Sequence, residues 1–295
     1  MERDLVIGAV TGYNFKQIAP WVNSLDRSGF TGLKALVVYN MDAQTVKELG
    51  ERGYIIFAFN QDPATKQLYY PNPNFSIVVE RFFHYYQFLH TFKPEVLESI
   101  RYVVATDVKD VIFQKNPSDY IDVIAKELPQ GLLVSSEALQ YKNEPWGANN
   151  LRLAFGDIMY DYHKNHRIIN AGVFSGSLGS FLSACKTVFL MSKGAPQHVP
   201  GGGGPDQAAL NLFLSNPAFA GHVEVATHVQ TWAAQLGTTM DPTKIQGFEK
   251  FLLEPAPKFD SEQDAVVNYQ GDPFTIVHQW DRVPEVREMV ERKYA

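Results

Sequence analysis

Short apolar runs rich in β-branched residues alternate along the chain with longer segments in which apolar residues recur every three or four positions. The short runs predict strands at 4–10, 33–40 and 54–60, and the longer segments predict helices at 15–29 and 43–53. Gly29 and Gly53 mark the expected ends of these helices. Strands that alternate with helices are typical of a parallel sheet with crossover helices, so this part of the chain predicts three βα units.

The run RYVVATDV (101–108) is apolar over nearly its whole length. In an open α/β sheet such a run predicts a central strand that is covered on both faces. Before it we expect a proline-rich loop at 63–74 and a helix at 76–92. After it the pattern predicts helices at 116–128 and 181–194, strands at 131–139 and 168–177, and a less regular segment at 140–170. Towards the end of the chain it predicts a loop that runs into a helix at 199–216, a long connection after 222–239, and a last short strand within 273–282. No repeat or clean linker divides the sequence, so we expect one mixed α/β domain over 1–295.

Composition narrows the class of protein. Hydrophobic residues make up 45% of the 295 residues and charged residues 20%, which is typical of a globular protein. The net charge of -6 argues against a general nucleic-acid or membrane-surface binder, because such proteins need a basic face. We expect no membrane span and a cytoplasmic location, since no apolar run approaches ~20 residues and the start is acidic. Cys185 is the only cysteine, and its apolar helical surroundings predict a buried, inert thiol.

The stretch TDVKDVIFQ (106–114) places Asp107 and Asp110 at the end of the predicted central strand. Ligands of open α/β sheets bind at the carboxyl ends of the strands, and carboxylates suit Mg²⁺ or Mn²⁺. Residues i and i+3 of a strand face opposite sides, so the two carboxylates can converge only if the chain turns after Val108. The alternative is that Asp107 caps the strand while Asp110 pairs with a neighbouring lysine on the surface.

A histidine follows the last predicted strand. His278, in PFTIVHQW, could complete an Asp, Asp, His metal set, and imidazole suits Mn²⁺ better than Mg²⁺. A purely structural histidine is the other interpretation.

Other candidate ligand contacts lie near the predicted strand ends. In GAVTGYN, Tyr13 offers a stacking face for a base, and Thr11 or Asn14 could read its edge. Arg81 could pair with a phosphate or have only a packing role. The glycines at 201–204 predict a mobile flap over a ligand or a plain linker.

Four blocks in order, VVATDVKDVIFQKNP, INAGVFSGS, GPDQAALNLF and IVHQWDR, together resemble GT-A type nucleotide-sugar-dependent glycosyltransferases. In glycogenin-like and bacterial galactosyltransferase-like members, the comparable blocks are a DxD motif, an Asn-Ala-Gly strand, an Asp-Gln helix start and a C-terminal histidine that binds the metal. The resemblance covers most of the chain. It implies a Rossmann-like GT-A fold with a mixed, mostly parallel central sheet flanked by helices, a nucleotide-binding half at about 1–117 and an acceptor-binding half at about 118–295.

The resemblance also implies an activity: transfer of a hexose or pentose from a UDP- or GDP-sugar to a hydroxyl of a saccharide or glycan. Carried over to this sequence, it implies a divalent cation (Mn²⁺ or Mg²⁺) at Asp107, Asp110 and His278, and the donor sugar at Asn170, Ala171 and Gly172. It also implies that the anomeric region lies at Asp206 and Gln207, and the nucleotide at Thr11, Tyr13 and Arg81. Two features depart from the family. The acidic motif is DVKD, so either aspartate could be the direct ligand, and Ala208 follows Gln207, so retention or inversion stays open.

Glycosyl transfer needs a carboxylate near the reacting hydroxyls, and Asp206 is our preferred candidate, with Glu137 and Glu144 as rivals. Glu144 and Trp146 could bind an acceptor sugar or pack under a loop. Trp280, with Asp281 and Arg282, would lie beside the diphosphate. A nucleotidyltransferase of the same fold is one alternative, although GAVTGYNFKQ lacks its glycine-rich basic signature. A catalytically inactive sugar-nucleotide-binding protein is the other.

Overall fold

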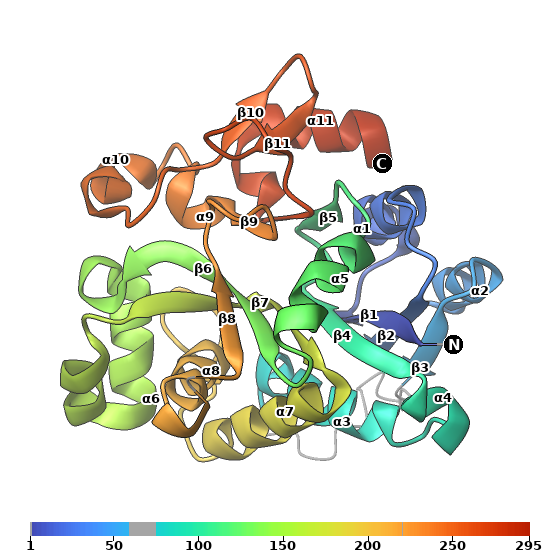
Figure 1. The fold of residues 1–295 in the computed structure, drawn as a ribbon, viewed down its shortest axis with the longest axis horizontal. Helices are drawn as coiled ribbons and strands as arrows, with labels where there is room; N and C mark the ends of the chain where they lie inside the picture. The colour runs from blue at the N-terminus through green and yellow to red at the C-terminus, as the bar shows by residue number, and fades with distance from the viewer. Residues whose placement is uncertain (1, 59–74, 220) are drawn as a thin grey trace.

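The computed structural model describes residues 2–58, 75–219 and 221–295, and its centre is a seven-stranded sheet in the order β3-β2-β1-β4-β7-β6-β8 (Figure 1). All neighbouring pairs are parallel except those that β7 makes with β4 and β6. The strands are β1 (Arg3–Thr11), β2 (Leu33–Tyr39), β3 (Ile55–Ala58), β4 (Ile100–Thr106), β6 (Leu132–Gln140), β7 (Arg167–Ser177) and β8 (Val223–Ala226). The mixed, mostly parallel sheet is confirmed, with the predicted central strand in its middle.

Helices cover both faces of this sheet because successive strand residues point to opposite sides. In β1, Leu5 and Ile7 contribute to one buried cluster and Val6 to another. The first cluster lies under α3 (Ile77–Leu89), α7 (Leu178–Ser192) and α8 (Asp206–Leu214). The second lies under α1 (Phe15–Arg27), α2 (Ala43–Glu51) and α5 (Pro117–Glu127). The short α4 (Pro94–Glu98) leads into β4.

Helix α1 also braces the end of β4. A capping box between Asn14 and Gln17 starts the helix, and the apolar residues of its buried face recur at helical spacing. From that face the indole nitrogen of Trp21 donates to Thr106 Oγ1 at 2.8 Å. Thr106 is the last residue of β4, so this buried bond fixes the strand end immediately before Asp107.

A second sheet of three strands lies on the α1 and α5 side of the central sheet, in the order β5-β12-β9 (Figure 1). Its strands are β5 (Val111–Phe113), β9 (Ala233–Gln235) and β12 (Ile276–His278), and α11 (Pro284–Tyr294) packs against it. A two-stranded hairpin, β10 (Lys258–Asp260) and β11 (Ala265–Val267), and the short helices α9 (Leu236–Thr239) and α10 (Ile245–Phe248) complete this region.

The prediction that 140–170 is less regular is wrong for most of this segment. It contains the 19-residue helix α6 (Pro145–His163), which Glu144 caps and which kinks at Gly156, where φ is 84°. Pro145, Gly147 and Gly156 weaken the helical pattern, but proline is tolerated at a helix start and glycine permits the kink.

Three further expectations have different outcomes. Cys185 is fully buried, and burial raises the pKa of its thiol, as expected of an inert side chain. The predicted loop at 63–74 and the last two residues of the strand predicted at 54–60 lie outside the described residues. Among the helices that the structure describes, we find none with the length and apolarity needed to cross a bilayer.

Candidate functional site

The chain turns between β4 and β5, and this turn brings the two aspartates of the DVKD motif together. Asp107 follows the last residue of β4, and Asp110 precedes the first residue of β5. Backbone hydrogen bonds hold both ends of the turn: Asp107 N donates to Gly172 O at 2.7 Å, and Gln279 N donates to Asp110 O at 2.7 Å. The turn that an i, i+3 pair needs in order to converge is therefore present.

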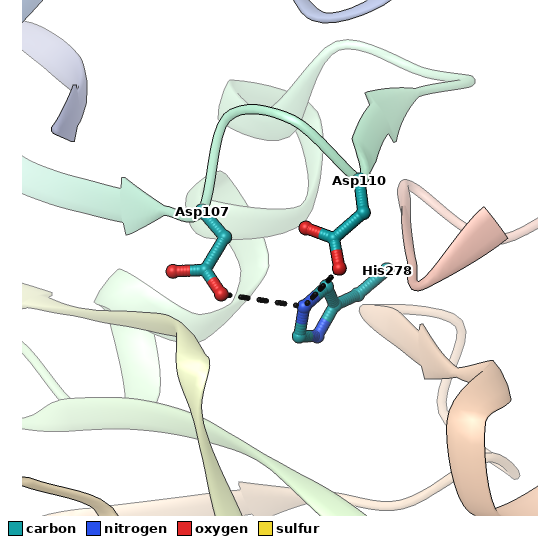
Figure 2. A group of neighbouring side chains, drawn as sticks. All are labelled: Asp107, Asp110 and His278. Carbon is teal, nitrogen blue, oxygen red and sulfur yellow. Dashed lines mark ion pairs between the residues drawn. The ribbon is translucent and has the colours of Figure 1, made fainter. Parts of the chain in front are cut away.

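His278 completes the cluster from the end of β12. Its Nε2 lies 3.5 Å from Asp107 Oδ2 and 3.6 Å from Asp110 Oδ2, and the imidazole points between the two carboxylates (Figure 2). The ligand atoms of the three side chains all lie within 4.8 Å of one another. Burial alone would lower the pKa of His278, but the charges of Asp110 and Asp107 raise it to about 9. A cation that binds here replaces that proton.

The surroundings fit a divalent cation. Two carboxylates and one imidazole are ligands that Mn²⁺ accepts. Gly172 lies against the cluster, where a Cβ atom would be 2.5 Å from His278 Cε1 and 2.8 Å from Asp107 Oδ2. Only glycine leaves this space free, so the predicted Asn-Ala-Gly block borders the three candidate ligands directly.

Arg81 joins the Asp107, Asp110 and His278 cluster to Asp206. Its Nη1 donates to Asp107 Oδ1, and its Nη2 lies 3.1 Å from Asp206 Oδ2 and 3.3 Å from Ala171 O. Burial would raise the pKa of Asp107, but Arg81 and His278 lower it below the usual range. Burial raises the pKa of Asp206 to about 6, against the attraction of Arg81. The guanidinium is thus already used by two carboxylates, and its predicted contact with a phosphate stays a prediction.

Glu137 is held by two amides. Its Oε1 accepts from Asn170 Nδ2 at 2.8 Å and from Gln207 Nε2 at 3.1 Å. Burial, and then repulsion from Glu144, raise the pKa of Glu137. Gln207 also accepts from Ala171 N at 3.2 Å, so the Asn-Ala-Gly strand, the Asp-Gln helix start and Glu137 form one hydrogen-bonded group. Ala138, the next residue, is non-glycine backbone with φ of 60°, a strained conformation of the kind that clusters at functional sites.

Two cavities meet at the Asp107, Asp110 and His278 cluster. The larger has a volume of about 410 Å³, and the smaller, of about 310 Å³, contains Thr11 and Tyr13. Val78, Arg81, Asp107, Asp110 and Arg282 line both. The larger cavity brings together most of the predicted site residues: Arg81, Asp107, Asp110, Glu137, Glu144, Trp146, Asn170, Ala171, Gly172, Asp206, Gln207 and His278.

The glycine-rich loop forms a wall of the larger cavity. Gly201 and Gly203 lie against the indole of Trp146, so close that a Cβ on either would be 3.0 Å or 3.2 Å from the ring. Trp146 Nε1 donates to Gly202 O at 3.2 Å, and Asn150 Nδ2 donates to Gly204 O at 2.8 Å. These contacts hold the loop against α6. A plain linker, the other interpretation of these glycines, would not need such contacts.

Two predicted residues have other partners in the structure. Asn14 uses its side-chain oxygen to cap α1 and is not among the residues that line the smaller cavity. Trp280 is 7% exposed and is buried with Ile112 and Met289 in the core between the second sheet and α11. It lines neither cavity. Their proposed contacts with the base and the diphosphate stay predictions.

Sequence reasoning overlooked Gln235, Gly237, Thr238 and Lys244, of which the last three line the larger cavity. Gln235 is fully buried, and its Oε1 lies 2.7 Å from His278 Nδ1. Its sequence surroundings, WAAQLG, carry no motif, and a polar residue within an apolar run was the only available signal.

Comparisons with known proteins give a fold but no sequence family. No protein-family model matches the sequence, and no curated protein sequence matches it. The apo crystal structure of mouse xyloside xylosyltransferase 1 is similar with a TM-score of 0.51 and 12% identity, over 94% of this chain and 97% of that one. The apo structure of the bifunctional glycosyltransferase WbbM is similar with a TM-score of 0.54 and 13% identity, over 98% of this chain and 50% of that one. This chain therefore spans about half the length of the WbbM chain.

The chain has a GT-A-like fold. In this fold Asp107 follows β4 of the seven-stranded sheet and Gly172 lies in β7 of the same sheet, while His278 lies in the second sheet. The likeness concerns the arrangement of helices and strands, and the chemistry of the site follows from the side chains described above.

Proposed function

We propose that the protein is a divalent-metal-dependent glycosyltransferase that moves a hexose or pentose from a UDP- or GDP-sugar to a hydroxyl of a saccharide or glycan. The observation that carries this proposal is the Asp107, Asp110 and His278 cluster, which lies where two cavities of a GT-A-like fold meet. A donor whose nucleoside and sugar occupy the two cavities has its diphosphate at the cluster, where a cation would be bound.

The three side chains would hold Mn²⁺ or Mg²⁺, and the bound ion neutralises charge on the diphosphate leaving group as a Lewis acid. Thr11 and Tyr13 line the smaller cavity, and Tyr13 offers its ring to the base. The larger cavity takes the donor sugar beside Asn170, Ala171 and Gly172.

Asp206 is the carboxylate that we assign to the reacting region. It is 5% exposed, lines the larger cavity, and is fixed by Arg81. When ionised it accepts a hydrogen bond from a sugar hydroxyl, which orients the donor or acceptor. Glu137 is already bonded by Asn170 and Gln207, so it positions those amides.

The acceptor would enter along Trp146 and Glu144. Glu144 caps α6 by accepting from the backbone nitrogens of Trp146 and Gly147, and both Glu144 and Trp146 line the larger cavity. An indole beside a fixed carboxylate suits a sugar, which presents an apolar face and hydroxyl groups.

A donor hydrolysis screen tests the proposal. Purified protein is incubated with a panel of UDP- and GDP-sugars, with Mn²⁺ or with EDTA, and release of nucleoside diphosphate is measured. We expect Mn²⁺-dependent release from at least one donor, and a loss on the order of 100-fold in Asp110→Asn and His278→Gln. Asp161→Asn, which changes an aspartate paired with Lys164 on the surface, is the matched control and should keep full activity.

Nucleoside diphosphate release that is unchanged by EDTA contradicts the proposal. Binding of donors without turnover of any donor in the panel also contradicts it. Release of pyrophosphate from a nucleoside triphosphate and a sugar phosphate would instead identify a nucleotidyltransferase.

A further inference from the structure

Gln235 lies beside His278 in the second sheet. In the parallel pairing of β9 with β12, Gln235 is the register partner of His278, and in the antiparallel pairing of β5 with β12 the partner is Val111, which follows Asp110. The end of this small sheet therefore gathers Asp110, His278 and Gln235. Gln235 is fully buried and contacts the imidazole on the nitrogen that faces away from the carboxylates.

Every polar atom of Gln235 has a partner in the structure. Its backbone nitrogen donates to His228 Nε2 at 3.1 Å, and its backbone oxygen accepts from Thr239 Oγ1 at 2.6 Å. Its side-chain Nε2 donates to Ser135 Oγ at 2.7 Å, and its Oε1 lies 2.7 Å from His278 Nδ1. A side chain held at both ends is a rigid support for whatever it contacts.

Hydrogen-bond accounting decides which way the amide faces. Ser135 has one hydroxyl proton, and Ser135 Oγ donates it to Val173 O at 3.2 Å. Ser135 must therefore accept from the amide nitrogen of Gln235, which leaves the amide oxygen to face His278. An amide oxygen only accepts, so His278 Nδ1 must carry a proton.

We infer that Gln235, anchored by Ser135 and Val173, is a positioning residue that keeps the Nδ1 proton of His278 in place and leaves Nε2 as the nitrogen that binds the cation. The inference rests on the metal site of the proposed function. Without Gln235 the imidazole can rotate or carry its proton on Nε2, and that nitrogen is then lost as a ligand. Partners of this kind behind a metal-binding histidine typically change metal affinity by about 10- to 100-fold.

Mn²⁺ binding measures the effect without any turnover. The free Mn²⁺ signal in electron paramagnetic resonance is titrated against wild type, Gln235→Leu, Gln235→Glu and Ser135→Ala. We expect a 10- to 100-fold weaker affinity in Gln235→Leu and a smaller loss in Ser135→Ala, which frees the amide to flip. Gln235→Glu keeps an acceptor for Nδ1, and the Ser135 hydroxyl can rotate to donate to it, so this variant should bind within a few-fold of wild type.

Gln114→Leu is the control for folding. Gln114 is half-buried, and its amide also joins segments that are distant in sequence, since its Nε2 donates to Val266 O at 2.9 Å and to Phe274 O at 3.0 Å, but it does not contact His278. Loss of Mn²⁺ affinity in Gln235→Leu together with an unchanged affinity in Gln114→Leu separates positioning from general damage to the second sheet.

Nitrogen-15 NMR of the histidine rings gives a signature that structural damage alone would not produce. With Zn²⁺ as a diamagnetic probe, His278 should show a metal-bound Nε2 and a protonated Nδ1 in wild type, and a mixture in Gln235→Leu. A metal-bound Nδ1, or a Gln235→Leu affinity equal to wild type, overturns the inference while the metal site stands. Absence of Mn²⁺ binding in wild type overturns the inference together with the metal part of the proposed function.

Discussion

Burial makes ionisation costly for two carboxylates of the site, those of Glu137 and Asp206. Asp206 illustrates this: it is buried, and its pKa rises to about 6 from 3.8, so the folded state holds on to a proton that the unfolded state releases. Arg81, at 3.1 Å, offsets only part of the cost of burial. A buried carboxylate with an incompletely compensated charge suits a group that receives a further hydrogen bond when substrate binds.

Asp206→Asn should therefore stabilise the protein at neutral pH. Between about pH 3.8 and 6 the native state binds more protons at this site than the unfolded state does, so wild-type stability falls as pH rises through this window and the loss is complete above it. Asparagine does not titrate and can still accept from Arg81. We expect the variant to exceed wild type by on the order of 2–3 kcal/mol at pH 8 and by much less at pH 4. Urea unfolding at both pH values measures this difference, and an advantage that does not change with pH would contradict the assignment.

Single elements explain why part of the site could be predicted and part could not. The apolar run of β4 and the acid pair after it identified the end of the central strand, because a strand buried on both faces has a strong local signature. Strand β12 was also foreseen, but its pairing with β5 and β9 was not, since strands of three residues carry little periodicity of their own.

Residues whose roles depend on that pairing were missed for the same reason. Gln235 meets His278 only through the register of β9 with β12, and no spacing in the sequence encodes this contact. Trp280 shows the opposite case: its position next to His278 suggested a ligand contact, whereas the tertiary structure places it in the core under α11.

The glycine-rich loop is an element whose conformation depends on its support. Gly201, Gly202 and Gly203 all have positive φ, between 82° and 97°, and the loop rests on the indole of Trp146. Glycine loses more conformational entropy than other residues when it is ordered, so the contact with Trp146 must offset much of this loss and keep the loop in place.

Trp146→Ala should release the loop. We expect the Gly202 amide, which donates to Val199 O at 2.9 Å, to exchange roughly 5- to 10-fold faster with deuterium, while amides of the central sheet stay unchanged. Trp146→Phe is the graded control: it keeps an aromatic face under the glycines and loses only the hydrogen bond to Gly202 O, so its effect should be intermediate. Exchange at Gly202 that is the same in all three proteins would show that the loop does not depend on Trp146.

At the scale of the whole molecule, the Asp107, Asp110 and His278 cluster joins parts of the chain that are distant in sequence. Asp107 and Asp110 belong to the turn between β4 and β5, and His278 belongs to the C-terminal strand β12. Gly172 of β7 and Asp206 at the start of α8 surround them, so residues of both predicted halves, 1–117 and 118–295, line the larger cavity. A ligand at this point therefore stabilises contacts between the halves, and the division itself stays a prediction.

Thermal unfolding tests whether the chain behaves as one cooperative domain that the cation stabilises. A ligand that binds only the native state adds about 2.7 kcal/mol at a hundred times its Kd, and at roughly 2 °C per kcal/mol for a chain of this size we expect Tm to rise by about 5 °C with Mn²⁺. Scanning calorimetry should show a single transition that moves as a whole, because the cluster draws on both halves. In His278→Gln the shift should disappear. Two transitions, of which Mn²⁺ moves only one, would instead show that the halves unfold separately, and an undiminished shift in His278→Gln would place the cation away from this cluster.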